Sequence, residues 1–267
     1  MTFKAKALSL VRRGKREVIL TAIGFNGGNN LFKWQLAYSR TLDKGLISKV
    51  LYFPNQDAWL EMFPGLRKLS ITSDQIRFTD RRATYMGAAQ GVDYTPQERA
   101  RFIKDVLLTS DGFKQSLERA QAFVRDDDLV INVRRGDYYN SRFEPEFGIN
   151  IVEYVRQALA KQLALGPVGR VVLVSDNVPW CVDNLTHLAP QLEFVVNENR
   201  RDMFDDLAVL ACAKRLILAN STFSYWGAFI AQVLGTQLEN IVAPAFHQGD
   251  VPTASELWRD PRWNFIY

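Results

Sequence analysis

Between residues 129 and 243, short apolar runs alternate with helix-length segments, and this alternation restricts the fold more than any other feature of the chain. Strands are predicted at five of these runs: Leu129–Arg134, Val171–Ser175, Glu193–Val196, Leu216–Ala219 and Ile241–Ala243. Helical periodicity connects them at Ile149–Leu165, Val178–His187, Asp202–Cys212 and Phe223–Leu234. Because strands joined by helices form right-handed βαβ units, these residues are expected to build a parallel sheet that is covered on both faces.

The first half of the chain has a less regular pattern of the same kind. Strands are predicted at Val18–Ile23 and Val50–Phe53, with a helix over residues 31–42 between them. Thr95 is predicted to begin another helix, because Pro96 follows it and Glu98 completes a capping box.

The acidic run Asp126–Asp128 separates these two halves, and we interpret it as a solvated domain boundary. The expected architecture is an α/β protein with an N-terminal α/β domain (residues 1–125) and a C-terminal Rossmann-like domain (residues 126–250) that contains the parallel sheet. The aromatic tail, residues 251–267, is expected to pack back on the first domain.

The composition narrows the classes of function. A formal net charge of +4 over 267 residues suits an anionic substrate, but it is too small to argue for nucleic acid. Basic residues near the N-terminus leave peripheral association with a membrane open, and no apolar run has the length of a membrane span. Cys181 and Cys212 lie in apolar segments, which is typical of reduced thiols in a cytoplasmic protein. With two histidines in the chain, a multi-histidine metal site is nearly excluded.

The strand at Leu129 ends in Arg134, Arg135, Gly136 and Asp137. Ligands of open α/β sheets bind outside the carboxyl ends of the strands, where two guanidinium groups suit a phosphate or carboxylate. Asp128 and Asp137 leave an alternative open, in which the arginines pair with these acids and only hold the turn.

Two further polar segments follow predicted strands. Ser175-Asp176-Asn177 could contact a ribose or a base, or it could cap the next helix. Asn220-Ser221-Thr222 precedes Phe223 at the start of a helix, whose unpaired amides and dipole favour an anion, although a well-capped core helix would have the same residues. The chain has no GxxxxGK[ST] loop, and Gly24–Gly28 does not complete GxGxxG, so a P-loop or a dinucleotide fingerprint is absent.

Together these segments resemble one family. RRGD after a strand, the SD-x-x-x-W element at Ser175–Trp180 and ANSTFSYWGA at Ala219–Ala228 are similar to the three motifs of the inverting α-1,2-fucosyltransferases. Residues 28–32 (GNNLF) are similar to the N-terminal Gly-Asn-Gln-Leu-Phe turn of that family, and residues 263–266 (WNFI) to its ending. The resemblance begins near Ile23 and is weakest over residues 54–124.

The resemblance implies a GT-B-like fold of two facing Rossmann-like domains, and transfer of fucose from GDP-fucose to a glycan hydroxyl with inversion and without a metal or other cofactor. Arg134 would contact the diphosphate, with Arg135 supporting it, and Asp176 would lie near the guanosine. The donor-binding residues implied are Asn29, Asn30, Arg134, Ser175, Asp176, Asn220, Ser221, Thr222 and Phe223. The partners would be a GDP-sugar and an oligosaccharide or polysaccharide acceptor, in the cytoplasm or at the inner face of the membrane.

The sequence departs from the family's pattern at three positions. Asn132 stands in place of a His, Asn177 in place of an Asp and Asn30 in place of a Gln. Asn132 keeps a second hypothesis open, a homologue that binds a nucleotide sugar without transferring it. The catalytic set is expected to be Arg134, Arg135 and Asp137, but two neighbouring arginines weaken Asp137 as a base, so we expect it to orient an arginine.

Overall fold

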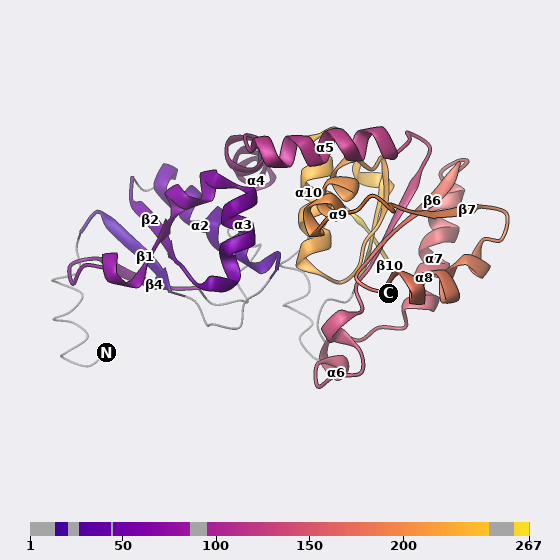
Figure 1. Cartoon of the computed structure of the whole chain (residues 1–267), viewed down its shortest axis with the longest axis horizontal. Helices are drawn as coiled ribbons and strands as arrows, with labels where there is room; N and C mark the ends of the chain where they lie inside the picture. Colours follow the sequence, from indigo (N-terminus) through magenta and orange to yellow (C-terminus); the bar gives the residue numbers. More distant parts are fainter. Residues whose placement is uncertain (1–13, 21–26, 44, 86–94, 246–258, 267) are drawn as a thin grey trace. The chain divides into compact units, whose positions relative to one another are not determined.

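The computed structural model describes residues 14–20, 27–43, 45–85, 95–245 and 259–266 (Figure 1). The chain forms two compact units, and each has a parallel β-sheet with helices packed on it. The α/β class with parallel sheets that the sequence predicted is therefore confirmed. The facing arrangement of the two domains stays a prediction.

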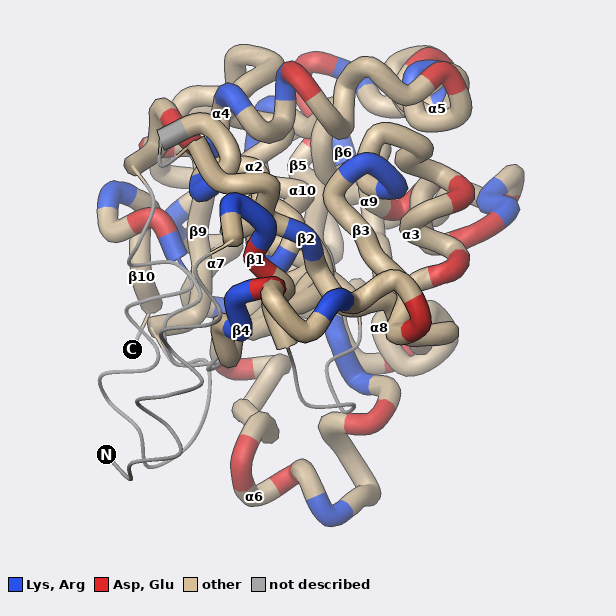
Figure 2. Tube along the Cα trace, turned by 90° about the vertical axis from the view of Figure 1, so that its left-hand side faces the viewer, with Lys and Arg blue, Asp and Glu red and all other residues tan. Residues whose placement is uncertain are grey.

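The sheet of the first unit has four strands in the order β3-β2-β1-β4, and all of their pairings are parallel. Basic residues lie along β1, β2 and β4 (Figure 2), and they are Arg16, Lys49, Arg81 and Arg82. The strands are β1 (Arg16–Leu20), β2 (Ile47–Leu51), β3 (Ser70–Ile71) and β4 (Arg81–Thr84). Residues 21–26, which include the predicted end of the first strand, lie outside the described residues, as do residues 1–13.

The helices of the first unit form where the sequence provides an apolar stripe or a cap. Leu31 and Trp34 are fully buried on α2 (Asn29–Asp43), as the helical spacing predicted. The capping box at Thr95 is confirmed: its hydroxyl accepts from the Glu98 N–H at 3.2 Å, and the Glu98 carboxylate accepts from the Thr95 N–H at 2.6 Å. The remaining helical segments are α3 (Asp57–Met62), α4 (Pro96–Phe102), a π-helical turn (Ile103–Leu107) and short 3-10 turns at Pro54–Gln56, Pro64–Leu69 and Ser73–Gln75.

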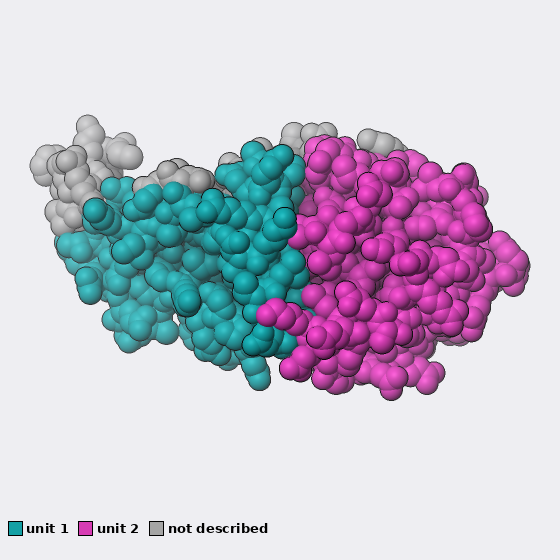
Figure 3. Space-filling view, turned by 90° about the horizontal axis from the view of Figure 1, so that it is seen from above, with its two compact units in different colours: residues 1–113 teal, residues 114–267 magenta. Residues whose placement is uncertain are grey.

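The division between the units falls between Phe113 and Lys114 (Figure 3), earlier in the chain than the acidic run. It lies inside helix α5 (Asp111–Phe123), whose later turns are tied to α9 (Met203–Cys212). The Arg119 guanidinium bonds the Asp205 carboxylate at 2.8 Å. The interpretation of the acidic run as solvated is wrong for Asp128, which is fully buried and pairs with Arg170 at 2.8 Å.

The sheet of the second unit has six parallel strands in the order β10-β9-β8-β5-β6-β7. The chain moves outward from β5 through β6 to β7, and then returns to place β8 on the other side of β5. The strand order therefore reverses between β5 and β8. The strands are β5 (Leu129–Val133), β6 (Arg170–Ser175), β7 (Glu193–Val196), β8 (Arg215–Ile217), β9 (Ile241–Pro244) and β10 (Asn264–Ile266), which confirms the five predicted runs.

The four long helices predicted for this unit are also confirmed, with small shifts at their ends. They are α7 (Ile151–Ala164), α8 (Val178–Leu185), α9 and α10 (Thr222–Val233). A short helix, α6 (Glu144–Phe147), and 3-10 turns at Gly136–Tyr138, Thr186–Leu188 and Leu238–Asn240 complete the unit.

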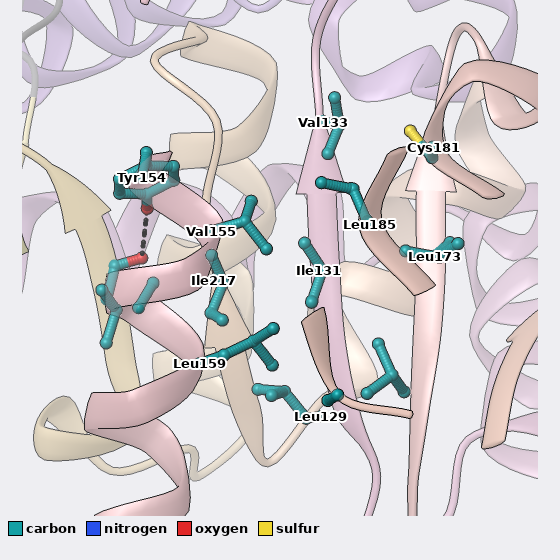
Figure 4. Close-up of a cluster of buried hydrophobic side chains, with 14 of the residues drawn as sticks. Leu129, Ile131, Val133, Tyr154, Val155, Leu159, Leu173, Cys181, Leu185 and Ile217 are labelled. Carbon is teal, nitrogen blue, oxygen red and sulfur yellow. Dashed lines mark hydrogen bonds between the residues drawn. The ribbon is translucent and has the colours of Figure 1, made fainter. Parts of the chain in front are cut away.

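One face of this sheet packs on α7 and α8 in a core of buried apolar side chains (Figure 4). Leu129, Ile131 and Val133 point into this core because strand side chains alternate between the two faces. The buried hydroxyl of Tyr154 donates to the Leu218 carbonyl at 2.7 Å, so this polar group is satisfied inside the core. The opposite face of β5 meets α10, through a contact between Asn132 and Ser224.

The described part of the tail, residues 259–266, belongs to the second unit. The expectation that it packs back on the first domain is wrong for these residues, because Asn264–Ile266 pairs with β9 as a sixth strand. The ring centroids of Trp263 and Phe229 of α10 are 5.1 Å apart, and this contact also holds the tail on the second unit. The rest of the tail, residues 251–258, lies outside the described residues.

Candidate functional site

The polar segments singled out from the sequence follow three adjacent strands of the second unit, β6, β5 and β8. Parallel strands end at the same edge of a sheet, so Ser175-Asp176, Arg134-Arg135 and Asn220-Ser221 are brought together there. This edge is also where the strand order reverses, which is the usual position of the ligand in an open α/β sheet.

Arg134 is the centre of the site. Its guanidinium donates to Asp137 at 2.6 Å and bonds Asp176 at 2.8 Å. Partial burial disfavours its charge, but the two carboxylates outweigh that cost and raise the pKa of Arg134 above its usual value. The alternative in which the arginines pair with neighbouring acids holds for Asp137 and fails for Asp128, whose partner is Arg170.

Asp176 joins the end of β6 to the turn after β5. One of its carboxylate oxygens accepts from the backbone N–H of Arg135 at 2.8 Å, while the other bonds Arg134. Gly136 is needed for this contact, because a Cβ atom on it would lie 2.5 Å from the Asp176 Oδ2 atom. A guanosine contact for Asp176 stays a prediction; the structure gives it the role of fixing the arginine turn.

Arg135 lies close to two aromatic rings. Its guanidinium carbon is 4.1 Å from the ring centroid of Trp180 and 4.6 Å from that of Tyr139. These two cation–π contacts help to hold the group in place. The supporting role at the diphosphate that is expected for Arg135 stays a prediction.

The N-terminus of α10 supplies the third part of the site. Ser221 is its N-cap residue, but the Ser221 side chain does not cap the helix and is bonded instead to Tyr138. Asn220 is buried and donates to the Phe147 carbonyl at 2.8 Å. Thr222 is buried and Phe223 half-buried. The amides of a helix's first turn lack intrahelical partners, so they can donate to an anion.

Tyr138 is a site residue that the sequence reasoning missed. Its ring stacks on Phe147, with 4.8 Å between the centroids, and lies 5.6 Å from the Arg134 guanidinium. Burial raises the pKa of Tyr138 to about 12, so its hydroxyl keeps its proton at neutral pH. Its place directly after RRGD was the available signal, since a 3-10 turn there folds the side chain back over the arginine.

The capping alternative for the segment after β6 is correct for Asn177. Its side chain accepts from the Trp180 N–H at 3.2 Å and so caps α8. Ser175 is buried, and its hydroxyl accepts from the Asn177 N–H at 3.0 Å. Both therefore shape the turn that presents Asp176.

Asn29 and Asn30 begin α2 in the first unit. The Asn30 side chain is fully buried, and neither its amide nitrogen nor its oxygen has a hydrogen-bond partner in the described part of the chain. Asn29 Oδ1 is also buried without a hydrogen-bond partner among the described residues. Buried amides without partners are costly, so the start of α2 is chemically suited to a polar ligand.

Within the described ranges, no group of three or more His, Cys, Asp or Glu side chains is arranged to hold a metal ion. The positive charge that this edge of the second unit offers to an anion comes from Arg134, Arg135 and the start of α10.

A family model described as Glycosyl transferase family 11 matches residues 96–266. The chain is 28% identical over 160 residues to galactoside 2-alpha-L-fucosyltransferase Sec1 of Mus musculus, in an alignment that covers 55% of this chain and 42% of that protein. It is 27% identical over 101 residues to the O-antigen biosynthesis glycosyltransferase WbnK of Escherichia coli, covering 38% of this chain and 33% of WbnK. The chain thus spans less than half the length of these relatives.

Among solved structures, the chain is similar to that of POFUT1 in complex with GDP-fucose, with a TM-score of 0.42, 14% sequence identity, and coverage of 71% of this chain and 58% of that one. The family model includes all three polar segments at the edge of the second sheet and more than half of the whole sequence. The chain belongs to glycosyl transferase family 11.

Proposed function

We propose that this protein transfers fucose from GDP-fucose to a hydroxyl of a galactoside, forms an α-1,2 linkage with inversion, and needs no metal. The observation that carries the proposal is the placement of Arg134 and Arg135 beside the N-terminus of α10, where the strand order reverses. These groups concentrate positive charge where a diphosphate would leave.

The chemistry follows from where charge develops. As the bond between fucose and GDP breaks, negative charge grows on the β-phosphate oxygens. The planar fork of Arg134 can donate two parallel hydrogen bonds to such oxygens, and it is already oriented by Asp137 and Asp176. An interaction that strengthens as the charge develops accelerates the reaction.

Two relatives support the choice of donor and acceptor. Sec1 is named a galactoside 2-alpha-L-fucosyltransferase, and WbnK an O-antigen biosynthesis glycosyltransferase. A galactose-terminated oligosaccharide or cell-surface polysaccharide is therefore the acceptor we propose.

The test is release of GDP from GDP-fucose, with and without a galactose-terminated acceptor. Acceptor-dependent release by the wild-type protein, lost in Arg134→Ala, would support the proposal. GDP-mannose serves as the control donor, since it has the same diphosphate and a different sugar. Tight binding of GDP-fucose with no release in the presence of acceptor would refute transfer and favour the homologue that only binds a nucleotide sugar.

The binding-only alternative depended on Asn132 in place of a His. In the structure Asn132 is buried within the sheet, and both ends of its amide group are hydrogen-bonded inside the protein. Its replacement of a His therefore changes an internal bridge, which gives no specific support to a loss of transfer.

We also propose that the protein works in the cytoplasm, at the inner face of a membrane. Two unpaired cysteines, Cys181 and Cys212, suit a reducing compartment. No helix in the described part of the chain is long and apolar enough to cross a bilayer. The basic residues Arg81 and Arg82 of β4 would attract anionic lipid. Sedimentation with phosphatidylserine vesicles at low and high salt tests the association, which salt should weaken.

A further inference from the structure

Asn132 is the one polar residue of strand β5. This strand lies between β6 and β8, where the strand order reverses. Only 7% of the surface of Asn132 is exposed. Strand alternation turns it away from the core that contains Ile131 and Val133, toward the face covered by α10. A buried amide in an apolar strand is costly unless its donor and its acceptor are satisfied.

The Asn132 amide is satisfied by hydrogen bonds that reach both neighbouring segments of the site. Its Nδ2 donates to the Val174 carbonyl at 3.0 Å. Its Oδ1 accepts from the Ser224 hydroxyl at 2.5 Å, and the Ser224 oxygen accepts in turn from the Ala219 N–H at 3.0 Å.

Each of these contacts adjoins a functional segment. Val174 precedes Ser175 and Asp176, and Ala219 precedes Asn220. Ser224 lies in the first turn of α10, and Asn132 itself stands two residues before Arg134. One buried side chain therefore links the three segments at the carboxyl edge of the sheet.

We propose that Asn132, acting through Ser224, is a positioning residue that fixes the first turn of α10 in register with the arginine turn. The effect on donor binding that we expect from this role rests on the proposed function. Loss of the bridge would leave the Ser224 O–H without its acceptor and remove the Asn132 donor from the Val174 carbonyl, and the first turn of α10 would shift or open in response. A displacement of about 1 Å at a site that holds a diphosphate is enough to lower both binding and rate.

A bridge that only stabilised the core would have a different signature, and Gln162 provides the comparison. Its buried amide donates to the carbonyls of Leu216 at 3.2 Å and Asn240 at 2.9 Å, near the starts of β8 and β9 and away from the carboxyl edge. Gln162→Ala therefore removes a similar bridge from the same unit without touching the site.

The experiment compares Asn132→Ala, Ser224→Ala, the double variant and Gln162→Ala. Hydrogen exchange of the backbone amides of residues 220–225 and calorimetric binding of GDP are both measured well below each variant's melting temperature. We expect faster exchange in this segment, and GDP binding weakened about tenfold or more, in both single variants at the site. The double variant should be little worse than either single one, because both break the same link. Gln162→Ala should lower the melting temperature and leave both the exchange of residues 220–225 and the binding of GDP unchanged.

Unchanged exchange at residues 220–225 in Ser224→Ala, which loses a single hydroxyl, would overturn the proposal even if Asn132→Ala failed to fold. Faster exchange with unchanged GDP affinity would also overturn it, since the bridge would then have no bearing on the donor. If the wild-type protein bound no GDP, the proposed function would fail, while the exchange measurement would still decide whether Asn132 positions the helix.

Discussion

Asp176 bonds Arg134 at 2.8 Å from the end of the neighbouring strand, and its second oxygen accepts from the Arg135 N–H at 2.8 Å. The arginine turn is thus fixed before any ligand binds. Asp137, the other partner of Arg134, has 58% of its side chain exposed, compared with 26% for Asp176. Asp176 is therefore the more enclosed partner of Arg134, and it belongs to the fixed frame of the site.

Arg134→Lys should lower the rate of GDP release on the order of 10²-fold or more, because lysine keeps the charge but loses the bidentate geometry. Arg156→Lys is the matched control, since Arg156 also pairs with a carboxylate, Glu153, on the exposed surface of α7. Steady-state kinetics with GDP-fucose measures both. A nearly wild-type rate for a folded Arg134→Lys protein would make Arg134 a structural residue.

Asp137→Asn should weaken donor binding while the acid limb of the pH–rate profile stays, because we expect Asp137 to orient Arg134 rather than to take the acceptor's proton. The measurement is a pH–rate profile together with GDP-fucose affinity. Glu144→Gln serves for comparison, since the Glu144 carboxylate already accepts from the Asn140 N–H at 2.9 Å. Intact affinity, a collapsed rate and a missing acid limb would instead identify Asp137 as the base.

Gly136→Ala should reduce activity strongly, because its Cβ would lie 2.5 Å from Asp176 Oδ2 and 3.2 Å from the Arg134 guanidinium carbon. The two residues would have to separate, and we expect a loss of about tenfold or more in the rate of transfer. In Gly65→Ala the new Cβ meets Val106 at 3.4 Å, an ordinary contact, so that variant should stay active. Equal activities would show that the Arg134–Asp176 pair tolerates displacement.

Removal of divalent metals should leave the rate of transfer unchanged, because arginines and a helix N-terminus supply the positive charge at the leaving diphosphate. The assay is GDP release before and after treatment with a chelator. Loss of activity that manganese or magnesium restores would contradict the proposed site.

The free energy of unfolding should rise with pH between about 8 and 10.5 through the side chain of Lys33, and Lys33→Met should lose this part of the rise. Burial lowers the pKa of Lys33 to about 8 from its usual value of 10.5. The unfolded chain therefore holds this proton more tightly, and the free energy of unfolding rises with pH between about 8 and 10.5 as the burial cost is relieved.

Urea unfolding of both proteins at pH 7 and at pH 9.5 measures this difference. Lys104→Met, at an exposed lysine, should keep the same rise with pH as the wild-type protein. A rise of equal size in Lys33→Met and in the wild-type protein would show that Lys33 is not its source.

Local sequence pattern was enough to predict most elements of the second unit and the segments expected to carry its chemistry. The alternation after Leu129 predicted the strands and helices of the second unit, and the box at Thr95 predicted a helix start, because periodicity and capping are encoded within a few neighbouring residues. RRGD and the polar turn after Ala219 were located for the same reason.

Which of these segments meet depends on the strand order and on contacts between distant residues. Only the strand order places β8 beside β5, and hence the start of α10 beside Arg134. Asp128 looked solvated in sequence but is buried because Arg170, far along the chain, neutralises it. Asn264–Ile266 is a strand because β9 offers it a free edge. Pairing of charges, strands and buried amides depends on neighbours that are distant in sequence, and local pattern contains no record of them.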